Sequence, residues 1–410
     1  MGEDGNLRMV LWALVVLVLS GAVGAFAVGW VMSNRFLVPQ PYSLMPEFEI
    51  VTIEDYAIEN DAIENNSAGD DGYFVTLPLE QQPSQFSDVR KEGVYNLLWE
   101  DGYGRLGPVL LDDDEQVVRR VVDIVGEAPK PGDPARLDVT IFRREPMEDH
   151  GIPFDELELE GAAGRLYAWW IDQDSNRAVL ALHGRRRADR TETLRILPTL
   201  VDSGWSVLAL AYRNHDLSDA SPDGLYHYGA SEFEDALVGV AELARQGVEE
   251  VVLYGFSMGG AVALEVARRW PAYGPELAGI VLDSPLLDPR EVIRKGARDA
   301  GLPLANMVAD LSLVVARLRT GVQWDSLDQR RSADEIDVPL LLIAGTADST
   351  VPIELVDGFA GRVEAPLEYL RLEGVDHVEG WNRARPRYEQ AVEDFLGRVS
   401  EGEQHTESGD

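Results

Sequence analysis

The chain has 410 residues, which allows two domains or one large domain with attached segments. Its formal net charge is −36, from 72 acidic and 36 basic residues, so its surface repels polyanions and nucleic acid is excluded as a partner. Cysteine is absent, which excludes disulfides, thiolate metal sites and a cysteine nucleophile.

The start of the chain predicts a membrane anchor. The 24 residues from position 9 to position 32 carry no charge, and as a helix they rise about 36 Å, enough to cross the hydrocarbon core. A cleaved signal peptide is the alternative, because Ala25, Phe26 and Ala27 have the small-x-small form of a cleavage site. We favour an uncleaved transmembrane anchor over residues 1–36. The protein is then expected in the cell membrane, single-pass, with an extracytoplasmic catalytic domain.

Two further regions precede the main domain. Residues 37–72 combine prolines with many acidic residues, which predicts an acidic flexible tether. Residues 73–150 contain short β-type runs separated by Gly, Pro and Asp turns, which predicts a β-rich subdomain with a packing or spacer role. The acidic run at 112–115 lacks the spaced ligands and the glycine of a calcium loop, so we expect an exposed turn and no metal site.

From residue 151 to about residue 400, apolar strands alternate with amphipathic helices. Continuous apolar strands joined by helices predict a mostly parallel sheet with helices on both faces. Residues 286–335 interrupt this rhythm with helix-prone sequence, which predicts a small helical cap. Residues 401–410 are expected to be a disordered polar tail. The strands are expected at residues 178–182, 206–211, 251–254, 279–282, 340–344 and 367–372.

The motif at residues 255–259, Gly-Phe-Ser-Met-Gly, follows a predicted strand and opens a predicted helix. Small residues on both sides of Ser257 allow the sharp turn of a nucleophile elbow, which exposes the serine hydroxyl. The following helix N-terminus faces a developing oxyanion, so the backbone N–H of Met258 is a candidate donor.

Together with this elbow, three further turns resemble those of the α/β-hydrolase superfamily. The Ala-Tyr-Arg run at 211–213 is similar to a block in its acyl-hydrolase and S33-peptidase-like branches. The resemblance covers roughly residues 151–399. It implies that Arg185, in the His-Gly-Arg turn at 183–185, supplies the second oxyanion N–H. It also implies that Asp348 and His377, in turns after the last two strands, are the acid and the base of a Ser-Asp-His triad. Asp283, at the end of its own strand, is the rival acid.

Arginines cluster beside this oxyanion turn, although the chain as a whole is strongly acidic. Arg186, Arg187 and Arg190 either pair with neighbouring carboxylates in a solvated loop or bind an anionic substrate group. We carry them forward as candidate substrate-binding residues.

The sequence thus predicts a serine hydrolase that cleaves carboxylic esters or thioesters through an acyl-enzyme on Ser257, without a cofactor. The expected partners are a small-molecule or lipid-like ester and, through the N-terminal helix, the membrane. A serine peptidase or amidase of the same fold, or a catalytically silent membrane-tethered binding module, are the alternatives. Because no expected site residue precedes position 151, deletion of residues 1–36 is expected to leave a soluble, active enzyme.

Overall fold

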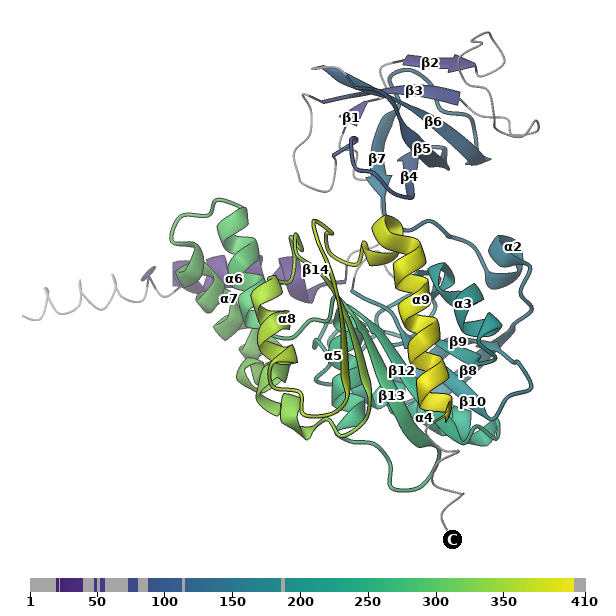
Figure 1. Ribbon diagram of the computed structural model, residues 1–410. Helices are drawn as coiled ribbons and strands as arrows, with labels where there is room; N and C mark the ends of the chain where they lie inside the picture. The colour runs from purple at the N-terminus through teal and green to yellow at the C-terminus, as the bar shows by residue number, and fades with distance from the viewer. Residues whose placement is uncertain are drawn as a thin grey trace, which may run out of the picture.

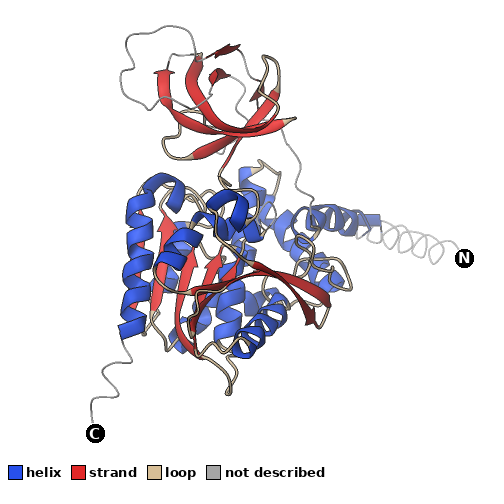
Figure 2. Ribbon diagram, turned by 90° about the vertical axis from the view of Figure 1, so that its right-hand side faces the viewer, coloured by secondary structure: helices blue, strands red, loops and turns tan. Residues whose placement is uncertain are grey.

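The computed structural model describes residues 20–21, 23–39, 48–49, 52–55, 73–79, 88–112, 115–185 and 189–401. These residues form two β-sheets, one in an N-terminal β-domain and one in a C-terminal α/β domain (Figure 1). A helical segment at the start of the chain, residues 23–37, lies beside the α/β domain (Figures 1 and 2). Segments far apart in the sequence therefore meet at the α/β domain.

The α/β domain is built on an eight-stranded sheet with the order β15-β14-β13-β12-β10-β11-β9-β8. β8 and β9 form an antiparallel hairpin and β9 is antiparallel to β11, whereas the other neighbouring strands are parallel. The strands are β8 (Asp155–Gly161), β9 (Gly164–Ile171), β10 (Arg177–Leu182), β11 (Ser206–Ala211), β12 (Glu250–Phe256), β13 (Glu276–Asp283), β14 (Leu340–Gly345) and β15 (Leu367–Leu372).

Helices cover both faces of this sheet. One face packs against α4 (Glu232–Arg245), α5 (Met258–Ala267) and α8 (Ile353–Ala360). The other packs against α3 (Leu197–Asp202), which follows η2 (Arg190–Arg195), and α9 (Gly380–Glu401). Because successive side chains of a strand point to opposite faces, Leu180 of β10 belongs to the first core and Val179 to the second. The mostly parallel, doubly covered sheet expected from the sequence is confirmed.

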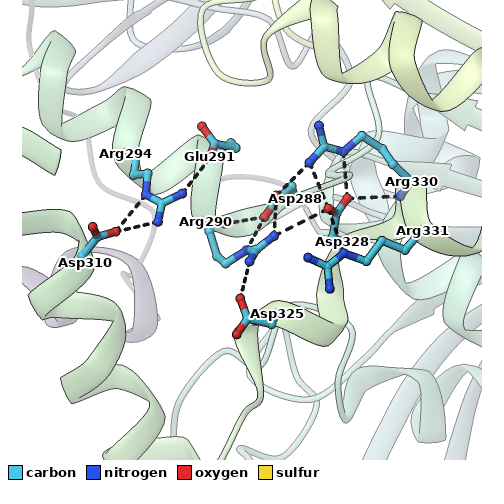
Figure 3. A network of polar contacts seen from close by, with 9 residues as sticks. All are labelled: Asp288, Arg290, Glu291, Arg294, Asp310, Asp325, Asp328, Arg330 and Arg331. Carbon is cyan, nitrogen blue, oxygen red and sulfur yellow. Dashed lines mark hydrogen bonds and ion pairs between the residues drawn. The ribbon is translucent and has the colours of Figure 1, made fainter.

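The connection from β13 to β14 forms a helical cap made of α6 (Pro289–Asp299), α7 (Ala305–Thr320), η3 (Trp324–Leu327) and η4 (Gln329–Glu335). A network of ion pairs ties its parts together (Figure 3). The side chain of Asp288 caps the N-terminus of α6. It also forms ion pairs with the guanidinium of Arg290 at 2.9 Å and with that of Arg330 in η4 at 3.1 Å. Arg294 of α6 pairs with Asp310 of α7 at 2.8 Å. The base of the cap is thereby fixed.

The β-domain is a seven-stranded antiparallel sheet with the order β1-β7-β4-β5-β6-β3-β2. Two of its strands lie within residues 37–72, so the prediction of a continuous tether there is wrong. Ile53 pairs with Val75, and the surrounding acidic residues concealed this short strand in the sequence. The strands are β1 (Phe48–Glu49), β2 (Thr52–Asp55), β3 (Tyr73–Pro78), β4 (Tyr95–Trp99), β5 (Gly102–Asp112), β6 (Gln116–Gly126) and β7 (Pro134–Asp138); the short helix α2 (Pro146–His150) follows.

The predicted membrane anchor requires a correction. Among the described residues, no helix combines the length and the apolar character that crossing a bilayer requires. This finding contradicts the predicted single-pass membrane localisation and leaves the membrane without support as a partner. Instead, Ser33, Phe36 and Leu37 at the end of the helical segment are buried against the α/β domain. Residues 1–19 of the predicted anchor and residues 402–410 of the predicted tail lie outside the described residues.

Candidate active site

Ser257 stands at the turn between β12 and α5, with φ 49° and ψ −111°. A positive φ is strained for a residue with a Cβ, so the surrounding structure must hold it. A Cβ at Gly255 would lie 2.6 Å from the Cα of Gly260, and a Cβ at Gly259 would collide with the carbonyl oxygen of Leu182 in the neighbouring strand. The flanking glycines thus permit the close approach that holds Ser257 at the C-terminal edge of the sheet.

Three side chains from separate turns form a continuous hydrogen-bond chain. His377 Nε2 lies 2.9 Å from Ser257 Oγ, and His377 Nδ1 lies 2.8 Å from Asp348 Oδ2. The second carboxylate oxygen of Asp348 accepts the backbone N–H groups of Thr350 and Val351, each at 2.7 Å. Asp348 is therefore fixed by its own loop and orients the imidazole toward the serine.

The electrostatics of His377 suit a proton acceptor. Burial by itself lowers the pKa of His377, but the charge of Asp348 and the hydrogen bond to it raise this pKa, and the net shift is upward. The imidazolium that forms when His377 takes a proton is thereby stabilised.

Asp283, the rival acid, has other partners. Its Oδ2 accepts the Tyr388 hydroxyl at 2.7 Å and its Oδ1 accepts the Ser284 hydroxyl at 3.0 Å. Ser284 Oγ in turn accepts the backbone N–H of Val378 at 3.0 Å. Burial raises the pKa of Asp283. The structure thus places Asp348 beside the imidazole, and Asp283 beneath the turn that carries it.

The turn expected to form the oxyanion hole lies against Ser257. A Cβ on Gly184 would be 3.3 Å from the Ser257 Cβ. The Gly184 N–H donates to Glu192 Oε2 at 2.6 Å, while Arg195 pairs with Glu192 at 3.2 Å and donates to the Val378 carbonyl at 2.8 Å. Burial raises the pKa of Glu192, and the Arg195 charge opposes this shift. Glu192 and Arg195 therefore connect the turn at 183–185 to the turn that carries His377, which we call the histidine turn.

With the Gly184 N–H already bonded, Met258 and Arg185 remain as the candidate oxyanion donors. Met258 is the first residue of α5, where backbone N–H groups have no acceptor within the helix. Arg185 follows Gly184 directly, and Gly184 lies against Ser257. Both positions agree with the arrangement in which two backbone N–H groups stabilise a tetrahedral oxyanion.

Comparisons with known proteins agree with the fold of the α/β domain. A family profile described as alpha/beta hydrolase fold matches residues 177–304. Human protein ABHD12B is 26% identical over 213 residues, which are 50% of this chain and 55% of that protein. The solved structure of the Pyrococcus furiosus esterase Pf2001 is 24% identical, with 63% of this chain and 95% of that chain covered and a TM-score of 0.52. These matches support the α/β-hydrolase superfamily as the family that the α/β domain resembles.

The similarity covers the α/β domain of this chain and only part of the length of each curated relative. The AB hydrolase superfamily protein YfhM of Bacillus subtilis is 33% identical over 86 residues, which are 21% of this chain and 29% of YfhM. The chain thus spans about half or less of these two curated relatives. Residues 84–138, in the β-domain, match the profile of a domain of unknown function. The family profile and the curated relatives support a hydrolase and leave the substrate open.

The protein has a cavity of about 560 Å³ beside Ser257 and His377. Besides the triad loops, its lining includes the turn at 183–185, the cap helices, the β-domain and the N-terminal helical segment. Much of the wall is apolar, which suits a substrate with an apolar group. Apolar lining residues include Met32, Phe36, Leu137, Val139, Leu286, Val292, Ile293, Leu302 and Val308.

The arginine cluster does not form one site. Arg190 is buried and pairs with Asp216 at 2.6 Å and with Glu156, so it does not line the cavity. The expectation that Arg190 binds substrate is therefore wrong, because its charge is already neutralised inside the protein. Arg186 and Arg187 lie outside the described residues, and their anion-binding role stays a prediction.

The β-domain contributes to the site, which its sequence did not indicate. Lys91 Nζ lies 2.9 Å from Glu379 Oε1 and 3.5 Å from Asp376 Oδ2, on either side of His377. Tyr95 donates to Glu379 Oε2 at 2.8 Å and also lines the cavity. The sequence hinted at this contact only through Lys91 itself, because lysine is rare in this acidic chain. The β-domain thus holds the histidine turn and is more than a spacer.

The N-terminal helical segment contributes as well. Met32, Arg35 and Phe36 line the cavity, so the expectation that no site residue precedes position 151 is wrong. Deletion of residues 1–36 would remove all three. The uncharged run at positions 9–32 suggested a bilayer-spanning helix, and nothing in the sequence indicated that its end, at Gly29 and Met32, lies against the protein.

Proposed function

We propose that this protein is a serine hydrolase that cleaves carboxylic esters or thioesters through an acyl-enzyme on Ser257. The observation that carries the proposal is the hydrogen-bond chain from Asp348 through His377 to Ser257, set at the wall of a largely apolar cavity. The same chain of groups serves amide cleavage in this fold, but no feature of the described residues favours amides.

Acylation would begin when Ser257 Oγ attacks the carbonyl carbon of the ester. As the new C–O bond forms, the hydroxyl proton passes to His377 Nε2, and Asp348 stabilises the imidazolium through Nδ1. The carbonyl oxygen becomes an oxyanion that the backbone N–H groups of Met258 and Arg185 stabilise. When the intermediate collapses, the bond to the alcohol or thiol breaks and the leaving group takes the proton from Nε2.

Deacylation would repeat these steps with water as the nucleophile. His377 takes a proton from water, the hydroxide adds to the acyl carbon, and the bond to Ser257 Oγ breaks as the serine regains a proton from Nε2. No other group is needed for the proton balance. The acyl group leaves as the carboxylic acid.

An inactive binding module would have no need for this arrangement. Ser257 is held at a strained φ, and strain of this kind persists where surrounding groups maintain it for function. The two-point support of Asp348 and the raised pKa of His377 suit proton transfer, and ligand binding alone would not require them.

Hydrolysis of p-nitrophenyl esters and aminoacyl anilides by purified protein tests the proposal. We expect ester turnover in the wild type and loss of at least about 10³-fold in kcat for Ser257→Ala. Ser326→Ala, a matched change at an exposed serine of η3, should retain full turnover. Undiminished turnover in Ser257→Ala, or faster cleavage of anilides than of esters, would contradict the proposal.

A further inference from the structure

The end of the N-terminal helical segment is fixed on the cap. We call residues 29–38 the wall segment. A Cβ at Gly29 would lie 2.6 Å from a methyl group of Val315, so the backbone lies directly against α7. The Arg319 guanidinium of α7 lies 4.2 Å from the Trp30 ring centre and donates to Ser33 Oγ at 2.7 Å. Stacking and hydrogen bonding together hold this part of the segment in one place.

The next residues are held by aromatic packing. Phe36 is 7% exposed, and its ring packs edge-on against Tyr228 at 6.4 Å and Trp324 at 6.0 Å between ring centres. The Phe36 carbonyl accepts the Tyr228 hydroxyl at 2.7 Å, and the Leu37 carbonyl accepts the Tyr226 N–H at 2.8 Å. The segment is thus anchored both to the cap and to the loop after β11.

One contact joins the wall segment to the oxyanion turn. Arg185 Nη1 donates to the Phe36 carbonyl at 3.1 Å, and its guanidinium lies over the Tyr228 ring at 5.3 Å. The side chain of Arg185 is therefore directed at the wall segment while its backbone N–H is the candidate oxyanion donor. A shift of Phe36 would therefore displace the Arg185 side chain and disturb the turn at 183–185.

The position of Met32 and Phe36 in the cavity gives the segment a role in substrate choice. Both line the cavity that contains Ser257 and His377, together with Val292, Ile293 and Val308 of the cap. An apolar group of the substrate that fills this cavity would therefore contact the wall segment. Resting on the proposed esterase function, we infer that residues 29–38 are a fixed wall of the substrate pocket, and that Phe36 and Met32 determine the size of the acyl or alcohol group accepted.

The test compares selectivity between short and long esters. The substrates are p-nitrophenyl acetate and octanoate, which differ in the acyl group, and methyl and octyl acetate, which differ in the alcohol. Phe36→Ala enlarges the pocket and should raise the long-to-short ratio of kcat/KM about fivefold or more in at least one pair, since each accommodated methylene is worth a factor of about 4. Phe36→Trp fills the pocket and should lower the same ratio.

Phe26→Ala is the matched control, because Phe26 is on the same helical segment, is 46% exposed and does not line the cavity. It should leave both ratios unchanged. Met32→Ala, which leaves the Phe36 contacts intact, should shift the same ratio as Phe36→Ala and covers the case in which Phe36→Ala fails to fold.

Unchanged ratios, within about twofold, in folded Phe36 and Met32 variants would overturn the inference. Labelling of Ser257 by a fluorophosphonate is measured in parallel. Wild-type protein that resists the probe and hydrolyses none of the four esters signals failure of the proposed function. If the variants are labelled and active but keep the wild-type ratios of kcat/KM, only the inference about the wall segment fails.

Discussion

Replacement of Lys91 by methionine should destabilise the turn that carries His377. Lys91 belongs to the β-domain, yet its ammonium lies 2.9 Å from Glu379 and 3.5 Å from Asp376 in the α/β domain. Methionine keeps most of the apolar stem, so the change mainly removes the charge. Two carboxylates beside the histidine then lose their shared cation.

The magnitude follows from burial. Removal of one partner of a buried ion pair costs about 3–5 kcal/mol. The side chains of Lys91 and Glu379 are 11% and 2% exposed, but Tyr95 still donates to Glu379 in the variant. We therefore expect a loss of about 2–3 kcal/mol in the free energy of unfolding. An unfolding entropy of about 2.1 cal/mol/K per residue over 410 residues gives about 1 °C per kcal/mol, so Tm should fall by roughly 2–4 °C.

The pH dependence of this loss has a defined sign. Burial alone would raise the pKa of Asp376, but the backbone N–H groups of Ser349 and His377, with Lys91, lower it below its usual range. A carboxyl group with a lowered folded-state pKa stabilises the protein above its unfolded pKa of about 4, and this stabilisation is lost as the pH falls further. The Tm difference between wild type and Lys91→Met should thus be full near neutral pH and shrink below about pH 4.

Scanning calorimetry and ester turnover measure the effect. Lys130→Met is the matched control, because Lys130 pairs with Glu127 in an exposed salt bridge, which contributes little to stability. Equal Tm values for the two lysine variants at neutral pH would refute the reasoning. So would a Tm difference that grows as the pH falls.

Three further predictions concern the triad and the cap. Asp348→Asn should lower kcat by about 10⁴-fold, because the amide cannot orient the imidazole, whereas Asp283→Asn should be much milder; the opposite ranking in ester assays would transfer the acid role to Asp283. Because the pKa of His377 is raised, kcat/KM for a neutral ester should increase with pH along a limb centred above about 6.5, and a limb below that value would contradict the assigned environment. Asp288→Ala removes a helix cap and two partly buried ion pairs, so calorimetry should show a loss of about 2–4 kcal/mol, with a smaller loss for Asp310→Ala at a more exposed pair.

The sequence was informative where structure depends on neighbouring residues. The elbow around Ser257 needs a strand, small flanking residues and a helix in direct succession, and all three are visible in the sequence. The turns with Asp348 and His377 follow strands in the same way. Parallel strands bring their C-terminal ends to one edge, so local motifs were enough to expect a shared site.

Contacts between distant segments were not predictable in the same way. No local pattern in residues 29–38 indicates that Gly29 lies against Val315 of α7 or that Phe36 packs against Tyr228 and Trp324. The charge of Arg190 was visible, but its pairing with Glu156 and Asp216 depends on the fold. The pairing of Lys91 with Glu379 joins two domains, and no local pattern indicates it.

Mapping of a fluorophosphonate adduct on the wild-type protein tests the central claim most directly. The hydrogen bond from Ser257 to His377 predicts rapid labelling that peptide mass spectrometry places on Ser257, and loss of labelling in His377→Ala. An adduct on another residue, or equal labelling in His377→Ala, would contradict the account of Ser257 as an activated nucleophile.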